Sequence, residues 1–173
     1  LAKLGLKKEE LVEKKGVEVG NTFHLETKYT DALGVYYKDE NGERQPIIMG
    51  CYGIGVSRLV GVIAELFADE KGLVWPEAVA PFKVHLLSLN QNEKAQELYD
   101  ALNKAGVEVL FDARDMNPGG KFADADLIGL PFQVIVSEKN LKDNKVEVKN
   151  RKSGAVEYLP LDSSEIVKYF QKN

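Results

Sequence analysis

The hydrophobic period changes repeatedly along the second half of this sequence, and this restricts the fold more than any other feature. β-rich apolar stretches at residues 82–89, 107–111 and 132–136 are typical of buried strands. Apolar residues at helical spacing fill residues 95–105 and 122–128 between them, and a glycine follows each run. Strands that alternate with helices need crossover connections, so we predict a parallel sheet with right-handed crossovers.

Capping and turn residues extend this pattern. Asn90 with Glu93 and Asp162 with Glu165 have the spacing of a capping box, which predicts a helix start at each place. Two apolar stretches within residues 146–159 flank the run Asn-Arg-Lys-Ser-Gly, which predicts an antiparallel hairpin. The expected architecture is a small α/β domain with a mixed, mainly parallel central sheet.

A proline-rich connection divides the sequence. Pro76 and Pro81 lie where the composition changes and the strand-helix pattern begins. The length of 173 residues allows one large or two small domains, at roughly 150 residues for an ordinary one. We therefore predict one domain over residues 1–79 and a second over residues 80–173.

The first half is predicted to be α+β with antiparallel strands. Asn41-Gly42 lies between apolar runs at residues 35–38 and 46–51, which is a strong hairpin signal. Further on, apolar residues at i, i+3, i+4, i+7 and i+11 predict one buried face of a helix. These are Val56, Leu59, Val60, Ile63 and Phe67.

Charge and cysteine content exclude several classes of protein. The net charge of −4 does not indicate a basic nucleic-acid domain, and the local net +3 of residues 138–152 is read as a solvated hairpin surface. A single cysteine excludes an intramolecular disulfide. Cys51, His24 and His85 are too few for a structural zinc site, so no bound metal is expected.

The remaining composition indicates a cytoplasmic protein that is part of a longer one. No window approaches the ~20 apolar residues of a membrane span, and the first residues carry no signal or transit pattern. The chain begins with Leu1, and its only methionines are Met49 and Met116. We therefore expect a fragment.

The sharpest motif is the run Gly-Cys-Tyr-Gly-Ile-Gly-Val-Ser-Arg at residues 50–58. It is neither a Walker loop nor a dinucleotide fingerprint. Arg58 lies near a helix start, where a cation is unfavourable unless an anion lies beside it. Glycines, helix-start N–H groups and Arg58 together suit a phosphate group. The alternative is a glycine bend chosen for tight packing, with a solvated arginine.

Residues 49–58 strongly resemble motif 3 of the class II aminoacyl-tRNA synthetases, specifically of the bacterial-type prolyl-tRNA synthetases. Residues 20–30 resemble the stretch lining that family's proline pocket, residues 73–82 its linker, and residues 112–131 its anticodon-binding domain. The likeness covers about residues 16–173 in unbroken order. It implies part of a class II antiparallel catalytic sheet followed by an anticodon-binding domain.

The resemblance implies roles for residues of the first half. Arg58 would bind the terminal phosphate of ATP, with Gly53 and Gly55 forming the floor beneath the adenylate. The proline pocket would contain His24, Thr27, Cys51 and Gly53, with Lys28 close by. We expect Cys51 to be a small buried wall residue rather than a nucleophile. Glu26 stands where the family usually has glycine, which predicts a less permissive backbone.

In the second half the resemblance implies anticodon contacts. Carboxyl ends of strands gather ligands in open α/β sheets, and polar residues follow the second and third strands there. Phe122 would stack on a base, Asp126 would accept from a guanine edge, and Lys139 would hold a base or phosphate. The implied set is Phe122, Asp126, Gln133, Lys139, Arg114 and Lys121, with Gln133 standing where arginine is often found.

The implied parent activates proline with ATP and Mg²⁺ and transfers it to tRNA(Pro), as a homodimer. Neither motif 1 nor motif 2 of the family is found in residues 1–49, so we expect the chain to be inactive alone. Two alternatives stay open: a non-catalytic RNA-binding module, and a sister class II synthetase for threonine, histidine or glycine. Arg58 and the motif 3 glycines argue against the first, because a pure RNA binder needs no ATP phosphate ligand. Residues 27–30 and the Cys-Tyr-Gly-Ile-Gly run at residues 51–55 favour proline over the second.

Overall fold

The structure is a computed structural model that describes residue 5, residue 7 and residues 11–172. The chain divides into two compact units, an N-terminal unit, Leu1–Val62, and a C-terminal unit, Ile63–Asn173. Leu1, on which the expectation of a fragment rests, lies outside the described residues. The predicted domain boundary between residues 79 and 80 stays a prediction.

The C-terminal unit is built on one mixed sheet of five strands in the order β6-β5-β7-β8-β9. Its strands are β5 (Val84–Leu89), β6 (Val109–Asp112), β7 (Phe132–Ser137), β8 (Lys145–Asn150) and β9 (Val156–Pro160). β5 pairs in parallel with β6 and β7, whereas β7–β8 and β8–β9 are antiparallel. The predicted parallel strands and the C-terminal hairpin are therefore confirmed, and parallel and antiparallel pairings are equal in number.

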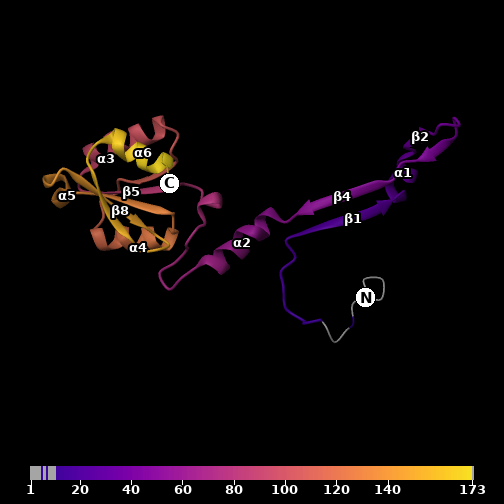
Figure 1. Ribbon diagram of the computed structural model, residues 1–173, viewed down its shortest axis with the longest axis horizontal. Helices are drawn as coiled ribbons and strands as arrows, with labels where there is room; N and C mark the ends of the chain where they lie inside the picture. The colour runs from indigo at the N-terminus through magenta and orange to yellow at the C-terminus, as the bar shows by residue number, and fades with distance from the viewer. Residues whose placement is uncertain (1–4, 6, 8–10, 173) are drawn as a thin grey trace. The chain divides into compact units, whose positions relative to one another are not determined.

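Helices cover both faces of this sheet (Figure 1). The helices are α3 (Asn92–Lys104), α4 (Pro118–Ile128), α5 (Glu138–Lys142) and α6 (Ser163–Lys172). The larger core lies under α3 and α6, where Leu98, Leu102 and Phe170 are buried against the sheet. A smaller core under α4 contains Leu87, Ala125 and Ile135. Alternate residues of β5 and β7 thus face opposite layers, as the period of a strand requires.

The helix ends test the capping predictions. Asp162 Oδ1 accepts hydrogen bonds from the backbone N–H groups of Ser164 (2.7 Å) and Glu165 (3.2 Å), so this cap is confirmed. The cap predicted at Asn90 is wrong. Asn90 has a φ of 58°, whereas a capping side chain needs an extended backbone, and α3 begins beyond it at Asn92.

The N-terminal unit consists of paired strands and short helices. Its elements before residue 56 are β1 (Gly20–Glu26), α1 (Lys28–Leu33), β2 (Tyr36–Lys38), β3 (Arg44–Pro46) and β4 (Met49–Ile54). β2 and β3 form the hairpin predicted around Asn41-Gly42. The predicted second strand was too long, because residues 49–51 belong to β4, which pairs antiparallel with β1.

The helix predicted after the glycines is present as α2 (Val56–Phe67), but its apolar face is not buried. Val56, Val60 and Phe67 are all exposed. α2 continues past Val62, the last residue of the N-terminal unit, and the described part of that unit offers only two-stranded ribbons, which lack the second layer that an amphipathic helix needs. The helix prediction is confirmed and the prediction of a buried face is wrong for this chain.

Candidate functional site

A row of polar side chains crosses the sheet beneath α4. His85, Gln133 and Lys149 lie directly opposite one another on β5, β7 and β8. Gln133 Nε2 and Lys149 Nζ both donate to Asp126 Oδ1 of α4, at 2.7 Å and 2.9 Å. We call His85, Gln133 and Lys149 the polar row. His85 and Gln133 are almost fully buried, so the polar row lies largely inside the C-terminal unit.

The polar row holds Asp126 in its charged form. Burial opposes ionisation of this carboxyl group, but hydrogen bonds from Gln133 and Lys149 and the charges of Lys149 and Arg151 outweigh it, so the pKa of Asp126 lies below its ordinary value. A carboxylate with two donors on one oxygen keeps acceptor capacity on its other oxygen. Asp126 can therefore accept a further hydrogen bond at neutral pH.

Two buried atoms of the row have no hydrogen-bond partner among the described residues. They are Nδ1 of His85 and Oε1 of Gln133, on side chains that are almost fully buried. Burial also lowers the pKa of His85, which keeps its ring neutral near pH 7. Unpaired buried polar atoms are rare in native proteins, and they mark a network that further polar groups can complete.

A second charged cluster lies beside the row at the end of β6. Arg114 donates through Nε and Nη2 to the two oxygens of Asp112, at 3.0 Å and 2.8 Å, and through Nη2 to Asp124 Oδ2 at 2.7 Å. These bonds raise the pKa of Arg114 and lower that of Asp112. With His85, the three charged residues line a cavity of about 300 Å³.

Lys121 is buried rather than presented to a ligand. Only 1% of the residue is exposed, and its Nζ donates to the carbonyl oxygens of Ser88 (2.6 Å) and Asp112 (3.3 Å). It ties together the carboxyl ends of β5 and β6. A direct contact between Lys121 and RNA would break these bonds, so its burial does not support the predicted role, which stays a prediction.

The predicted anticodon residues fall into two groups. Phe122 packs against the smaller core near the carboxyl end of β5, and Lys139 is exposed on α5 just after β7. Asp126 and Gln133 lie instead near the amino ends of β5 and β7. The structure therefore brings Asp126 and Gln133 into contact but does not join them to Lys139.

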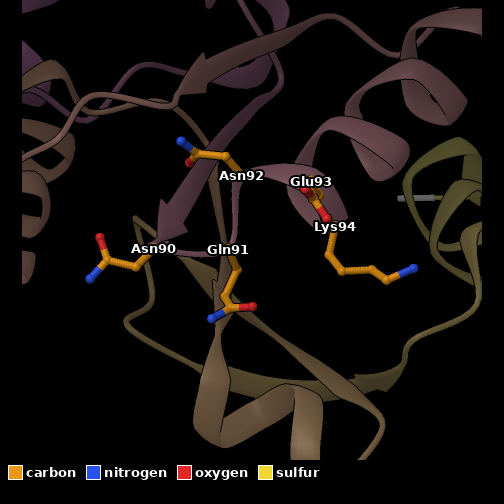
Figure 2. Close-up of a pocket in the computed structure, with 5 residues that line it drawn as sticks. All are labelled: Asn90, Gln91, Asn92, Glu93 and Lys94. Atoms are coloured by element: carbon orange, nitrogen blue, oxygen red, sulfur yellow. The ribbon is translucent and has the colours of Figure 1, made fainter.

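A further cavity lies at the carboxyl end of β5 (Figure 2). Its volume is about 340 Å³, and consecutive residues of the loop and of α3 line it, namely Asn90, Gln91, Asn92, Glu93 and Lys94. Figure 2 shows the three amide side chains leaving the loop in different directions. Asn92 Nδ2 donates to Ala113 O at 3.4 Å, which links this loop to the one after β6.

In the N-terminal unit, the glycine motif brings Gly55 and Arg58 together. Gly55 N donates to Val19 O at 2.9 Å, and a Cβ at Gly55 would lie 3.4 Å from Arg58 Cβ. The exposed Arg58 donates through Nη1 to Glu18 O from the first turn of α2. At Gly53 no described atom lies within 4 Å of such a Cβ. Arg58 is thus held by the chain beside the turn between β4 and α2.

The residues predicted for the proline pocket divide between two faces of the β1–β4 ribbon. His24 pairs with Gly50, whereas Cys51 pairs with Phe23, one position along. Since neighbouring residues of a strand point to opposite faces, His24 and Cys51 do too, and Gly53 shares the face of Cys51. Cys51 is exposed, so the expectation that it is buried is wrong for this chain.

The end of β1 shows why the position of Glu26 favours glycine. The register shifts between His24 and Glu26, and Glu26 has a φ of 50°. This left-handed conformation is one that glycine adopts at no steric cost. Thr27 follows as the N-cap position of α1, half-buried and without a capping bond from its side chain among the described residues.

Comparison with known proteins identifies the larger unit. The family model of the anticodon binding domain matches residues 78–173. The chain belongs to the anticodon binding domain family. The proline–tRNA ligase of Persephonella marina is 47% identical over 160 residues, which cover 90% of this chain and 28% of that protein. The proline–tRNA ligase of Geobacillus kaustophilus is 54% identical over 158 residues, 88% of this chain and 27% of that protein.

Solved structures agree with these relatives. The crystal structure of prolyl-tRNA synthetase from Cryptosporidium parvum complexed with L-proline and AMP matches 90% of this chain and 35% of that one, with a TM-score of 0.77 and 26% identity. The chain spans little more than a quarter of the length of the curated relatives. The resemblance to prolyl-tRNA synthetases and the predicted fold class are confirmed.

Within the anticodon binding domain, sequence reasoning missed several polar residues. His85 lies in a strand whose one other polar residue is Ser88, which could have marked it, but Lys149 and Arg151 carry no local signal. The reading of residues 138–152 as a solvated hairpin is wrong in part. Residues 138–142 form α5, and Arg151 is buried with 5% exposed. Among the described residues no helix could span a membrane and no cluster of His, Cys, Asp and Glu could hold a metal.

Proposed function

We propose that this chain is the part of a proline–tRNA ligase that carries motif 3 and the anticodon binding domain. The observation that carries the proposal is identity of 47–54% to proline–tRNA ligases over 88–90% of the chain. The parent protein would activate proline with ATP and transfer it to tRNA(Pro). We also propose that the parent acts in the cytoplasm as a homodimer.

The reaction has two steps. The carboxylate of proline attacks the α-phosphorus of ATP, forming prolyl-adenylate and releasing pyrophosphate. A terminal hydroxyl of tRNA(Pro) then attacks the prolyl carbonyl and releases AMP. Since negative charge on the phosphates must be stabilised throughout, arginines and Mg²⁺ would supply most of the catalytic effect.

Arg58 is the residue of this chain proposed to bind the terminal phosphate of ATP. Its exposed guanidinium extends from the first turn of α2, where helix N–H groups also favour an anion. Its bond to Glu18 O supports a fixed orientation, and Gly55 leaves room beside it. We propose Gly53 and Gly55 as the floor of the adenylate site and His24, Thr27, Cys51 and Gly53 as lining of the proline pocket.

The anticodon binding domain is proposed to read bases through Asp126. Its ionised carboxylate suits the N–H donors of a guanine edge, and Gln133 and Lys149 fix its direction. We propose Phe122 for stacking near the carboxyl end of β5, and Lys139 and Arg114 for further contacts with the RNA. Lys121 would act only by holding the ends of β5 and β6.

The first test is proline-dependent exchange of pyrophosphate into ATP by the full-length parent. Arg58→Ala should lower kcat/KM by about 100-fold or more, the cost of losing one charge-stabilising group. Arg44→Ala, the matched arginine on the β2–β3 hairpin, should leave exchange unchanged. Exchange with a different amino acid would favour a sister synthetase, and tRNA binding without any exchange would favour an RNA-binding module.

A further inference from the structure

The segment that precedes the residues matched by the family model is hydrogen-bonded to the anticodon binding domain. Leu73 N donates to Leu127 O at 3.0 Å, and Trp75 N donates to Gly129 O at 2.9 Å. These backbone bonds attach residues 69–75 to the last turn of α4. We call residues 69–75 the brace, and it precedes the matched residues 78–173.

Two glycines make this contact close. A Cβ at Gly72 would lie 2.4 Å from Leu127 Cα, and a Cβ at Gly129 would lie 1.8 Å from Leu73 O. Neither distance is possible for a real side chain atom, so both backbones approach because no side chain intervenes. The brace therefore has a defined seat rather than a loose surface contact.

Arg151 joins the brace to the end of α4. Its Nη1 and Nη2 donate to the two oxygens of Asp69, at 2.6 Å and 2.7 Å, and its Nε donates to Asp126 O at 3.1 Å. Asp69 also accepts from the backbone N–H of Lys71 and Gly72, which fixes the turn that starts the brace. One buried guanidinium thus holds the brace and the backbone of Asp126 together.

We propose that Arg151 is a positioning residue for anticodon recognition, and that the brace helps to fix the orientation of Asp126. The inference rests on the proposed function, because it assumes that Asp126 reads a base. The side chain of Asp126 is fixed by Gln133 and Lys149, and its backbone by Arg151. If Asp69 is neutralised, the buried Arg151 loses its bidentate ionic partner and keeps only the Asp126 carboxylate, whose Oδ1 lies 3.8 Å from Arg151 Nε, so the anchor of Asp126 loosens.

Asp69→Asn tests this with little risk to folding, because the carboxylate is 46% exposed and the amide oxygen can still accept from the turn. Glu70→Gln is the matched control, the same chemical change one residue away. Hydrogen exchange of the full chain should show the Leu73 and Trp75 amides exchanging about tenfold faster in Asp69→Asn. Amides of β5 and β7 should be unchanged.

The second measurement is binding of the full chain to the anticodon stem-loop of a proline tRNA and to the same stem-loop with its anticodon guanines replaced by adenines. Asp69→Asn should reduce the discrimination between the two by about fivefold or more. Glu70→Gln should keep it. Loss of stability alone would weaken both RNAs equally and leave this ratio unchanged, so the ratio separates positioning from folding.

The outcomes are distinct. Faster exchange with reduced discrimination supports the proposal. Faster exchange with unchanged discrimination overturns it, and the brace is then only structural. Unchanged exchange overturns the anchoring itself. If the unaltered chain shows no preference for guanine, the proposed reading by Asp126 fails, and the positioning role of Arg151 fails with it.

Discussion

The two units of this chain treat their apolar residues in opposite ways. In the C-terminal unit Leu86, Leu102 and Ile166 are fully buried between helices and sheet. In the N-terminal unit Tyr52 is 81% exposed and Ile54 72% exposed, although both lie in a paired strand. The C-terminal unit buries its apolar residues between its own layers, whereas the N-terminal unit leaves an apolar pair of strands exposed. In the proposed parent, we expect further strands of the catalytic sheet to cover that surface.

The two units also differ in how firmly the residues of their proposed binding sites are held in place. Two side chains of the polar row, Gln133 and Lys149, donate to the same carboxylate oxygen, so their hydrogen bonds fix the direction of Asp126. Arg58 is held by a bond to one carbonyl oxygen and otherwise faces solvent. A preorganised group needs supporting contacts around it. The proposed RNA site therefore carries more of its own geometry within this chain than the proposed ATP site does.

The largest expected effect comes from matched leucines in the two units. Leu102→Ala should lower the free energy of unfolding by about 3 kcal/mol, because it opens a cavity in the core under α3. Leu33→Ala, which truncates a side chain in α1 that is mostly exposed, should change it by about 0.5 kcal/mol or less. Urea denaturation of the full chain measures both. Equal losses would break the contrast between the units.

Matched glycines give the next effect. Gly129→Ala places a side chain on a residue with left-handed backbone and directs its Cβ against Leu73 O. It should lower the free energy of unfolding by about 2 kcal/mol or more. Gly61→Ala lies in the interior of α2, where no described atom would touch the new methyl group, and should stabilise that helix by about 0.5–1 kcal/mol. Thermal unfolding followed by circular dichroism distinguishes the signs. A tolerated Gly129→Ala would contradict the tight seat of the brace.

Lowering the pH should weaken the attachment of the brace. Hydrogen bonds from Arg151 and from backbone N–H groups hold the pKa of Asp69 well below its ordinary value. A depressed pKa contributes stability that is present above the unfolded value of about 3.9 and is lost as the pH falls below it. As the pH falls from about 4 toward 2, the Leu73 and Trp75 amides should therefore lose protection in the unaltered chain.

The matched carboxyl group for this experiment is Asp39 in the β2–β3 hairpin. Its pKa is also lowered, chiefly by the hydrogen bond from Gln45. Asp39→Asn should flatten the acid response of the hairpin amides and leave the brace amides unaffected. A change in the brace of that variant would show that the two units do not respond separately to pH.

The smallest effect is expected at Glu26. Glu26→Gly relieves the left-handed backbone at the end of β1 but adds freedom to the unfolded chain, so a net gain below about 1 kcal/mol is expected. Hydrogen exchange of the β1–β4 amides would detect slightly greater protection. Glu18→Gly, also on an exposed residue but without a positive φ, should give no gain.

Local signals account for what could be predicted. The succession β5, α3, β6, α4 and β7 follows from hydrophobic period and from glycine at helix ends, because these depend on neighbours in sequence. The pairing of β1 with β4 was not predicted, since residues 27–48 separate the strands and no single turn joins them. The α5 helix was missed because its five residues are too few to show a helical repeat of apolar positions.

For the candidate site too, the sequence pointed to individual residues but not to the contacts between them. The roles carried over by resemblance stay predictions, and the contacts of several of these residues depend on partners that lie far away in sequence. Lys149 donates to Asp126 from 23 residues away in sequence, and Arg151 donates to Asp69 from 82 residues away. No local pattern encodes such pairs, and Arg151 was read as part of a surface for that reason.

The buried Lys121 also gives the chain an internal chemical reporter. Reagents that acylate amines need an accessible, deprotonated amino group, and the amino group of Lys121 is enclosed by two carbonyl oxygens at the ends of β5 and β6. Exposed lysines such as Lys139 should be labelled at once. Lys121 should be labelled only when the ends of these two strands separate, so its rate of labelling measures how often that edge of the sheet opens.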